Sequence, residues 1–238
     1  MSEWTAKRFW KEAVAVDAGD GFTVHLDGRP VKTPAKAALI LPNQALAGAV
    51  AEEWNAQQER IDPYSMPVTR AANAAIDKVA PNVPAVAKLL VEYGETDLLC
   101  YRAEAPEALV ARQAAAWDPL LDWAATALKA PLNVTSGVVP CRQPAESLAS
   151  LSARVSAHSP FALTGLHDLV TLSGSLVIGL AAVAGWAGAD DLWERSRIDE
   201  TWQQEQWGRD DEAAAMADAK RRDFLQALRF FNLTQASA

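Results

Sequence analysis

The chain has 238 residues, half of them hydrophobic, so it can bury the core of one or two domains. Its net charge is −8 and its pI is about 4.9. This balance argues against nucleic-acid binding, because phosphate contacts need a basic patch that releases counterions. It argues equally against binding to an anionic membrane surface.

The first forty residues predict a small antiparallel sheet. Residues 12–17 form an apolar run, and residues 22–26 alternate between apolar and polar side chains, as in a half-buried strand. Asp27 and Gly28 form a two-residue hairpin turn, because both central positions of such a turn favour positive φ. A further apolar strand is expected over residues 38–41.

After these strands the sequence predicts helices almost throughout. Asn43 is a good N-cap for a helix that runs to about residue 58. Further helices are expected over residues 68–79, 84–93, 106–129, 144–158, 163–185, 189–207 and 210–231, and a loop or short strand over 134–140. Asp118-Pro119 should divide the long helix that begins at residue 106. We therefore predict an α+β fold, with a small antiparallel β-rich domain (residues 1–62, ending in a helix) and a larger all-α domain (63–238).

Residues 169–189 carry no charge and have about the length of a membrane span. Serines and glycines dilute the hydrophobicity, and no Lys or Arg anchors either end. We interpret the segment as a helix buried on all sides in a soluble bundle, where the small residues allow close approach of neighbouring helices. A membrane-anchored protein remains the alternative.

Cys100 and Cys141 lie far apart in sequence, each among apolar neighbours, and are expected to be reduced thiols in the core. The N-terminus has no apolar stretch of the signal-peptide kind. We therefore expect a cytoplasmic protein without disulfides.

A search for catalytic chemistry finds little. The sequence contains none of the nucleophile-elbow, dinucleotide or P-loop motifs, and no histidine has a second ligand at metal-site spacing. No cofactor or metal is expected. The pattern around Asp97 favours a helix cap or an ion-pair network, for which Arg102 and Arg112 are candidate partners. A small-molecule enzyme that uses Asp97, Tyr101, Arg102 and His167 in a cleft between the two domains remains an alternative.

The most unusual stretch is residues 190–212, which holds nine acidic residues, three arginines and three tryptophans. It predicts a helix with Trp193, Trp202 and Trp207 set among carboxylates. Tryptophan and arginine are enriched at binding hot spots, so the segment favours a surface that binds another protein. The alternatives are that the carboxylates form a solvated helix face and that some tryptophans face inward.

Several strings in this chain are familiar when they are taken together. They are GFTVHLDGRPVKTPAK, LAGAVAEEWNAQQERIDPYSMPVTR, ETDLLCYRA, RQAAAWDPLLDWA and SRIDETWQQEQWG. In this order they resemble the Atp-twelve family of ATP synthase assembly chaperones over about residues 8–231. The resemblance implies a small β-domain followed by a helical domain. It also implies a non-enzymatic chaperone that binds the free alpha subunit of the catalytic head and shields its intersubunit surface until the beta subunit replaces the chaperone.

The resemblance also assigns roles to particular residues. Trp54 matches the tryptophan of the family's EWxxQ motif, and its helix face suggests that it docks the first helix on the β-domain. The pair Asp199 and Glu200 matches an acidic cluster that other members carry as consecutive glutamates, with Thr201 here in the third place.

We therefore predict one contact surface for the alpha subunit. Trp193, Trp202 and Trp207 would supply apolar contacts, and Asp199, Glu200 and Glu205 would meet basic groups. Gly28, Trp54 and Asp97 would have structural roles. The protein is expected to be a monomer in a bacterial cytoplasm, whereas eukaryotic members of the family act in the mitochondrial matrix.

Overall fold

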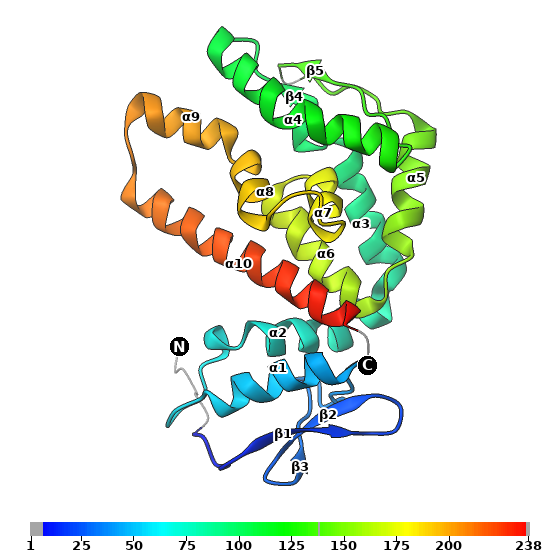
Figure 1. The fold of residues 1–238 in the computed structure, drawn as a ribbon, viewed down its shortest axis with the longest axis vertical. Coiled ribbons are helices and arrows are strands. Elements are labelled where there is room, and N and C mark those ends of the chain that lie inside the picture. The colour runs from blue at the N-terminus through cyan, green and yellow to red at the C-terminus, as the bar shows by residue number, and fades with distance from the viewer. Residues whose placement is uncertain (1–6, 138, 237–238) are drawn as a thin grey trace. The chain divides into compact units, whose positions relative to one another are not determined.

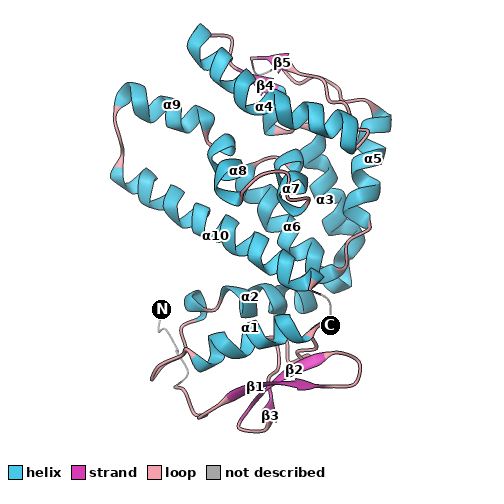
Figure 2. Ribbon diagram, viewed as in Figure 1, coloured by secondary structure: helices cyan, strands magenta, loops and turns pink. Residues whose placement is uncertain are grey.

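The computed structural model describes residues 7–137 and 139–236, which form two compact units (Figure 1). The first unit contains the chain up to Val83, together with Ser159–Gly165 and the chain from Arg229 onward. The second unit contains Pro84–His158 and Leu166–Leu228. The predicted α+β class is confirmed, since a small antiparallel sheet near the N-terminus is followed by a mostly helical chain (Figure 2).

The sheet of the first unit has the strand order β1-β2-β3, with all neighbours antiparallel. The strands are β1 (Ala13–Asp17), β2 (Phe22–Leu26) and β3 (Arg29–Pro30). Asp27 and Gly28 connect β2 to β3 with φ values of 47° and 80°, which confirms the predicted hairpin.

The strand predicted over residues 38–41 is wrong. Only isolated bridges form there, between Lys32 and Ala38 and between Phe22 and Leu41. Leu39 and Leu41 are both fully buried. The residues of this run are therefore apolar because they are buried in the core, and they do not form a paired β-strand.

Two helices pack in the same core as the sheet. Asn43 caps α1 (Gln44–Asn55) as predicted, since its side chain accepts a hydrogen bond from the Leu46 amide at 2.8 Å. Val68 and Ala72 of α2 (Pro67–Ala74) are buried in this cluster as well. The first compact unit therefore continues past residue 62, where the sequence placed the start of the helical domain.

The remaining elements follow in chain order. They are a 3-10 turn (Pro63–Ser65), a π-helical turn (Ala75–Val79), a 3-10 turn (Ala80–Asn82), α3 (Val83–Glu95), a 3-10 turn (Leu98–Cys100), β4 (Tyr101–Arg102), α4 (Glu107–Ala127), β5 (Thr135–Ser136), α5 (Ala145–Ser156), α6 (Pro160–Ser173), α7 (Leu176–Val183), α8 (Ala189–Ser196), α9 (Ile198–Trp207) and α10 (Asp211–Gln235). β4 and β5 form a two-residue parallel pair.

Three helices differ from the prediction in whether they are broken. α4 continues through Pro119, because Trp117 and Leu120 on either side of it are fully buried and hold the helix together. The helix predicted over residues 163–185 breaks at Gly174 (φ 73°), and the Ser175 side chain then caps α7. The helix predicted over 189–207 breaks at Arg197, whose φ of −115° lies outside the helical range.

The helix predicted to be buried on all sides over residues 169–189 is confirmed only in α7, whose residues from Leu176 to Ala182 are all buried. The chain breaks at Gly174, and after α7 ends at Val183 the residues Ala184, Gly185 and Gly188 are exposed. Gly179 lets α6 and α7 approach closely, because a Cβ there would lie 2.5 Å from the Val170 side chain. Among the residues that the structure describes, no helix is long and apolar enough to cross a membrane.

Both cysteines are free thiols. Cys100 is buried as predicted, and burial raises the pKa of its thiol to about 12. Cys141 is only half-buried, because it lies in the loop before α5, so its predicted place in the core is wrong.

Candidate protein-binding site

The acidic segment forms α8, the break at Arg197, α9 and the start of α10. None of the ten residues of α9 is buried, although a helix in a globular protein usually buries an apolar stripe. α9 ends at Trp207, which is 81% exposed, and Gly208 follows with a φ of 93°. The tip of α9 therefore presents a large apolar side chain to solvent.

The three tryptophans of this segment lie in three different environments. Trp193 is buried, with its ring 5.7 Å from the Phe224 ring, so its predicted contact with a partner is corrected to a place in the core. The Arg197 guanidinium covers the Trp193 ring at 5.7 Å. Trp202 is half-buried and Trp207 is exposed. The apolar surface offered by the segment is thus narrower than the sequence indicated.

Two of the predicted carboxylates are held by neighbouring residues of α4. Arg112 donates a hydrogen bond from Nη1 to Glu205 Oε2 at 2.6 Å. Gln113 donates from Nε2 to Asp199 Oδ1, also at 2.6 Å. The Arg112 hydrogen bond lowers the pKa of Glu205, and the same bond raises the pKa of Arg112. Both carboxylates therefore already have partners within the second unit.

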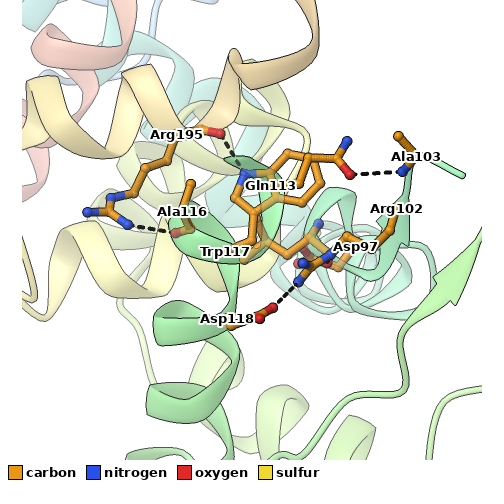
Figure 3. A network of polar contacts seen from close by, with 9 residues as sticks. Asp97, Arg102, Ala103, Gln113, Ala116, Trp117, Asp118 and Arg195 are labelled. Carbon is orange, nitrogen blue, oxygen red and sulfur yellow. Dashed lines mark hydrogen bonds and ion pairs between the residues drawn. The ribbon is translucent and has the colours of Figure 1, made fainter. Parts of the chain in front are cut away.

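The end of α8, which precedes α9, is fixed one helical turn further along α4 (Figure 3). We call this end the root of α9. The Trp117 indole donates to the Arg195 carbonyl at 2.7 Å, and the Arg195 guanidinium donates to the Ala116 carbonyl at 2.6 Å. Arg195 also pairs with Asp191 at 2.9 Å. Since Trp117 is fully buried, this end of the segment is anchored in the core.

The segment ETDLLCYRA (residues 95–103) also contacts α4. The Arg102 side chain donates to the Leu99 carbonyl at 2.9 Å, pairs with Asp118 at 2.8 Å and covers the Trp117 ring at 5.2 Å. The Gln113 side-chain oxygen accepts a hydrogen bond from the Ala103 amide at 2.8 Å (Figure 3). The two familiar strings ETDLLCYRA and RQAAAWDPLLDWA therefore build one support for α9.

Asp97 forms the predicted helix cap rather than an accessible acid. Its fully buried carboxylate accepts from the Leu99 amide at 3.1 Å, the Ser175 hydroxyl at 2.7 Å and the Val177 amide at 3.0 Å. Burial raises its pKa to about 6 against the opposing effect of these donors. The carboxylate fastens the 3-10 turn to the start of α7.

Two other residues of the enzyme alternative, Arg102 and His167, contact neighbouring side chains or backbone groups. Arg102 is held by Leu99 and Asp118, and His167 lies 3.0 Å from Asp168 on its own helix. Across residues 7–137 and 139–236, no group of three potential ligands could hold a metal ion.

Two further carboxylates of the segment pair with arginines that sequence reasoning did not assign to them. Glu200 pairs with Arg197 at 2.6 Å, and Asp190 pairs with Arg221 of α10 at 2.6 Å. Glu200 keeps 44% of its side chain exposed and belongs to the acidic pair of the resemblance. Its arginine partner lies three residues earlier in the chain, whereas the partner of Glu205 lies on α4.

The EWNAQ string lies in the first unit, away from these contacts in sequence. The Trp54 ring packs edge-on against the Trp10 ring with centroids 5.1 Å apart. Asn55 donates to the Ala13 carbonyl and accepts from the Ala13 amide, both at 2.7 Å, and so fastens α1 to β1. These contacts agree with a structural role for Trp54.

Known proteins place the chain in a family. The family described as ATP12 chaperone protein matches residues 7–125. The chain belongs to this family. The crystal structure of Atp12 from Paracoccus denitrificans is 54% identical, covers 96% of this chain and 98% of that chain, and superposes with a TM-score of 0.94.

Two further known structures are similar to this chain. A mutant of the Paracoccus denitrificans Atp12p, with one aspartate replaced by lysine, is 54% identical, covers 98% of this chain and 100% of that chain, and has a TM-score of 0.94. An Agrobacterium tumefaciens protein described as a candidate chaperone is 40% identical, covers 96% of this chain and 86% of that chain, and has a TM-score of 0.92. Membership of the ATP12 family makes this protein an assembly chaperone.

Proposed function

We propose that this ATP12-family protein assists assembly of the proton-translocating ATP synthase by binding the free alpha subunit of its catalytic head. The chaperone would shield the intersubunit surface of the alpha subunit until the beta subunit replaces it. The observation that carries the proposal is α9, a helix without a buried residue that combines carboxylates with the exposed Trp207.

The apolar and the acidic residues of α9 would have different tasks. Trp207 and the half-buried Trp202 would supply most of the binding energy, because large aromatic side chains dominate binding hot spots. Glu200 and Asp199 would meet basic groups of the alpha subunit. Carboxylates at the rim of an interface select the partner and speed the encounter more than they add affinity.

Binding and release would need no bound nucleotide. The sequence contains no P-loop motif, and competition by the beta subunit for an overlapping surface would suffice to displace the chaperone. We propose a monomeric binding protein without a catalytic step, which acts in a bacterial cytoplasm.

The test is capture of purified alpha subunit by variants of α9. Glu200→Lys and Trp207→Ala are each expected to weaken capture at least tenfold without loss of folded protein. The charge reversal should be compatible with the fold, since the Glu200 side chain is 44% exposed.

Matched controls lie in the first unit. Glu52→Lys reverses an exposed charge on α1, and Tyr64→Ala removes an exposed aromatic side chain from the 3-10 turn before α2. Both controls should capture the alpha subunit as the parent protein does. The proposal fails if the two α9 variants bind as tightly as these controls.

A further inference from the structure

The contacts between α4 and the acidic segment follow a regular order. Arg112, Gln113, Ala116 and Trp117 lie on one side of α4, since Arg112 and Ala116 are four residues apart, as are Gln113 and Trp117. Their partners run in the opposite direction along the chain, from Glu205 through Asp199 to Arg195, at 2.6–2.7 Å. The arrangement is an antiparallel row of polar contacts along α9 and the end of α8.

The side chains at the two ends of this row differ in burial. Trp117 and Gln113 are buried, whereas the Arg112 side chain is 35% exposed and the Glu205 side chain is 47% exposed. Trp207 lies two residues beyond Glu205 and is more exposed still. The root of α9 is therefore anchored, and its tip is held by one solvent-exposed ion pair.

The chain at the root of α9 does not continue the preceding helix. Arg197 has φ −115° and ψ 16°, so the direction of α9 is not fixed by continuous helical hydrogen bonding from α8. A helix of ten residues is marginally stable without tertiary contacts. The contacts with α4 therefore determine where α9 lies and how well it is ordered.

We propose that Arg112 and Gln113 are positioning residues for client binding, and that Glu205 acts through Arg112 instead of contacting the client. This inference rests on the proposed function of α9. By holding both ends of α9, the two α4 residues place Trp207 and Glu200 in a fixed arrangement before the client arrives. Binding then avoids the entropy cost of ordering the helix, which is the general advantage of a preorganised surface.

Glu205 is better suited to this role than to a client contact. Its charge-assisted hydrogen bond from Arg112 joins α9 to α4, so a client cation at Glu205 would replace a contact between two helices, whereas the Arg197–Glu200 pair lies within three residues of the chain. An exposed ion pair adds little to global stability, so its loss should free the helix without unfolding the unit.

The decisive experiment is a charge swap between α4 and α9. Four proteins are compared: the parent, Arg112→Glu, Glu205→Arg and the double variant, in which the pair can form again with reversed sign. Two quantities are measured, the Kd for purified alpha subunit and the amide hydrogen exchange of residues 198–207 in the free protein.

Each single variant is expected to raise the Kd about tenfold and to accelerate exchange in α9. The double variant should restore both quantities to within about threefold of the parent. If the double variant binds as weakly as Glu205→Arg while its exchange is restored, Glu205 contacts the client and the inference is wrong. Unchanged exchange in the single variants would also overturn it.

These outcomes remain separate from the proposed function. If the parent protein itself does not bind the alpha subunit, the proposed function fails. The hydrogen exchange of the four free proteins would still decide whether Arg112 and Glu205 hold α9 in place.

Discussion

The two compact units use their charged and polar side chains in different ways. The first unit has ten basic and ten acidic residues, whereas the second has twelve basic and twenty acidic residues and so carries the whole net charge of −8. In the first unit, polar side chains of the familiar strings mostly bond to backbone groups. In the second, they join one helix to another and leave the tip of α9 exposed.

Two carboxylates of the first unit illustrate its pattern. Glu53 accepts from the Val68 and Thr69 amides at 2.8 and 2.7 Å and thereby caps α2. Asp77 accepts from the Thr33 hydroxyl at 2.6 Å and from the Ala35 amide at 3.1 Å. These two carboxylates stabilise the fold of the first unit through their hydrogen bonds. We therefore propose the second unit, with its excess of acidic residues and its exposed Trp207, as the place of client binding.

The largest effect is expected where the acidic segment meets the core of the second unit. Trp117→Ala removes a fully buried ring and its hydrogen bond to Arg195, so it should lower the free energy of unfolding by about 3–5 kcal/mol. Urea denaturation followed by circular dichroism measures this loss. A loss below about 1 kcal/mol would show that α8 and α9 are not anchored at this point.

Asp97→Asn is expected to destabilise the second unit by about 1–3 kcal/mol. An asparagine has one acceptor oxygen where the aspartate has two, so the Ser175 hydroxyl or the Val177 amide would lose its acceptor. Asp97→Ala serves as the comparison, since it removes both acceptors and should cost more. Equal stability of the parent and the asparagine variant would contradict the observed hydrogen bonds.

The same residue gives a pH dependence of known sign. The pKa of Asp97 is raised from 3.8 to about 6 in the fold, so between these values the folded state binds more protons than the unfolded state. The contribution of Asp97 to stability is then largest below pH 4 and falls by about 3 kcal/mol as the pH rises through 6. The difference in unfolding free energy between the parent and Asp97→Asn, measured from pH 4 to pH 7, should shrink with rising pH. Growth of that difference would contradict the raised pKa.

A smaller effect is expected in the first unit. Asn55→Ala removes two hydrogen bonds between α1 and β1, at a site that water can reach, and should cost about 1 kcal/mol. Capture of the alpha subunit by the folded variant should be unchanged. Weakened capture at equal folded concentration would remove the contrast between the two units.

The smallest effect on stability is expected at the Arg112–Glu205 pair. Salt screens exposed charges, so raising the ionic strength from 0.05 to about 0.5 M should leave the unfolding free energy almost unchanged. The amide exchange of α9 should nevertheless accelerate in the parent protein and change little in an Arg112→Met variant. An equal response of both proteins would mean that this ion pair does not hold α9.

The sequence predicted those parts of the fold that local chemistry determines. The hairpin follows from Asp27 and Gly28, and the start of α1 follows from Asn43, since each needs only its neighbours in the chain. The breaks at Gly174 and Arg197 were missed. Ser175 caps α7 together with Asp97, which comes from 78 residues earlier, and no local pattern reveals such a partner.

The candidate site was predictable in part for the same reason. The acidic segment was identified from composition, but the residues that hold its carboxylates lie 86 and 93 positions away along the chain. Trp193 and Trp207 look alike in sequence, and only the packing against Phe224 shows that Trp193 faces inward. The sequence offered one indication of these contacts, the adjacent polar residues Arg112 and Gln113 in the mostly apolar string RQAAAWDPLLDWA.

The central claim is that the exposed tip of α9 captures the free alpha subunit. The most direct measurement is a pull-down from the lysate of the source cell, with the parent protein and Trp207→Ala as baits. The account predicts that the parent recovers the alpha subunit without the beta subunit, whereas Trp207→Ala recovers neither. Recovery of equal amounts of alpha subunit by both baits, or of no alpha subunit by the parent, would contradict it.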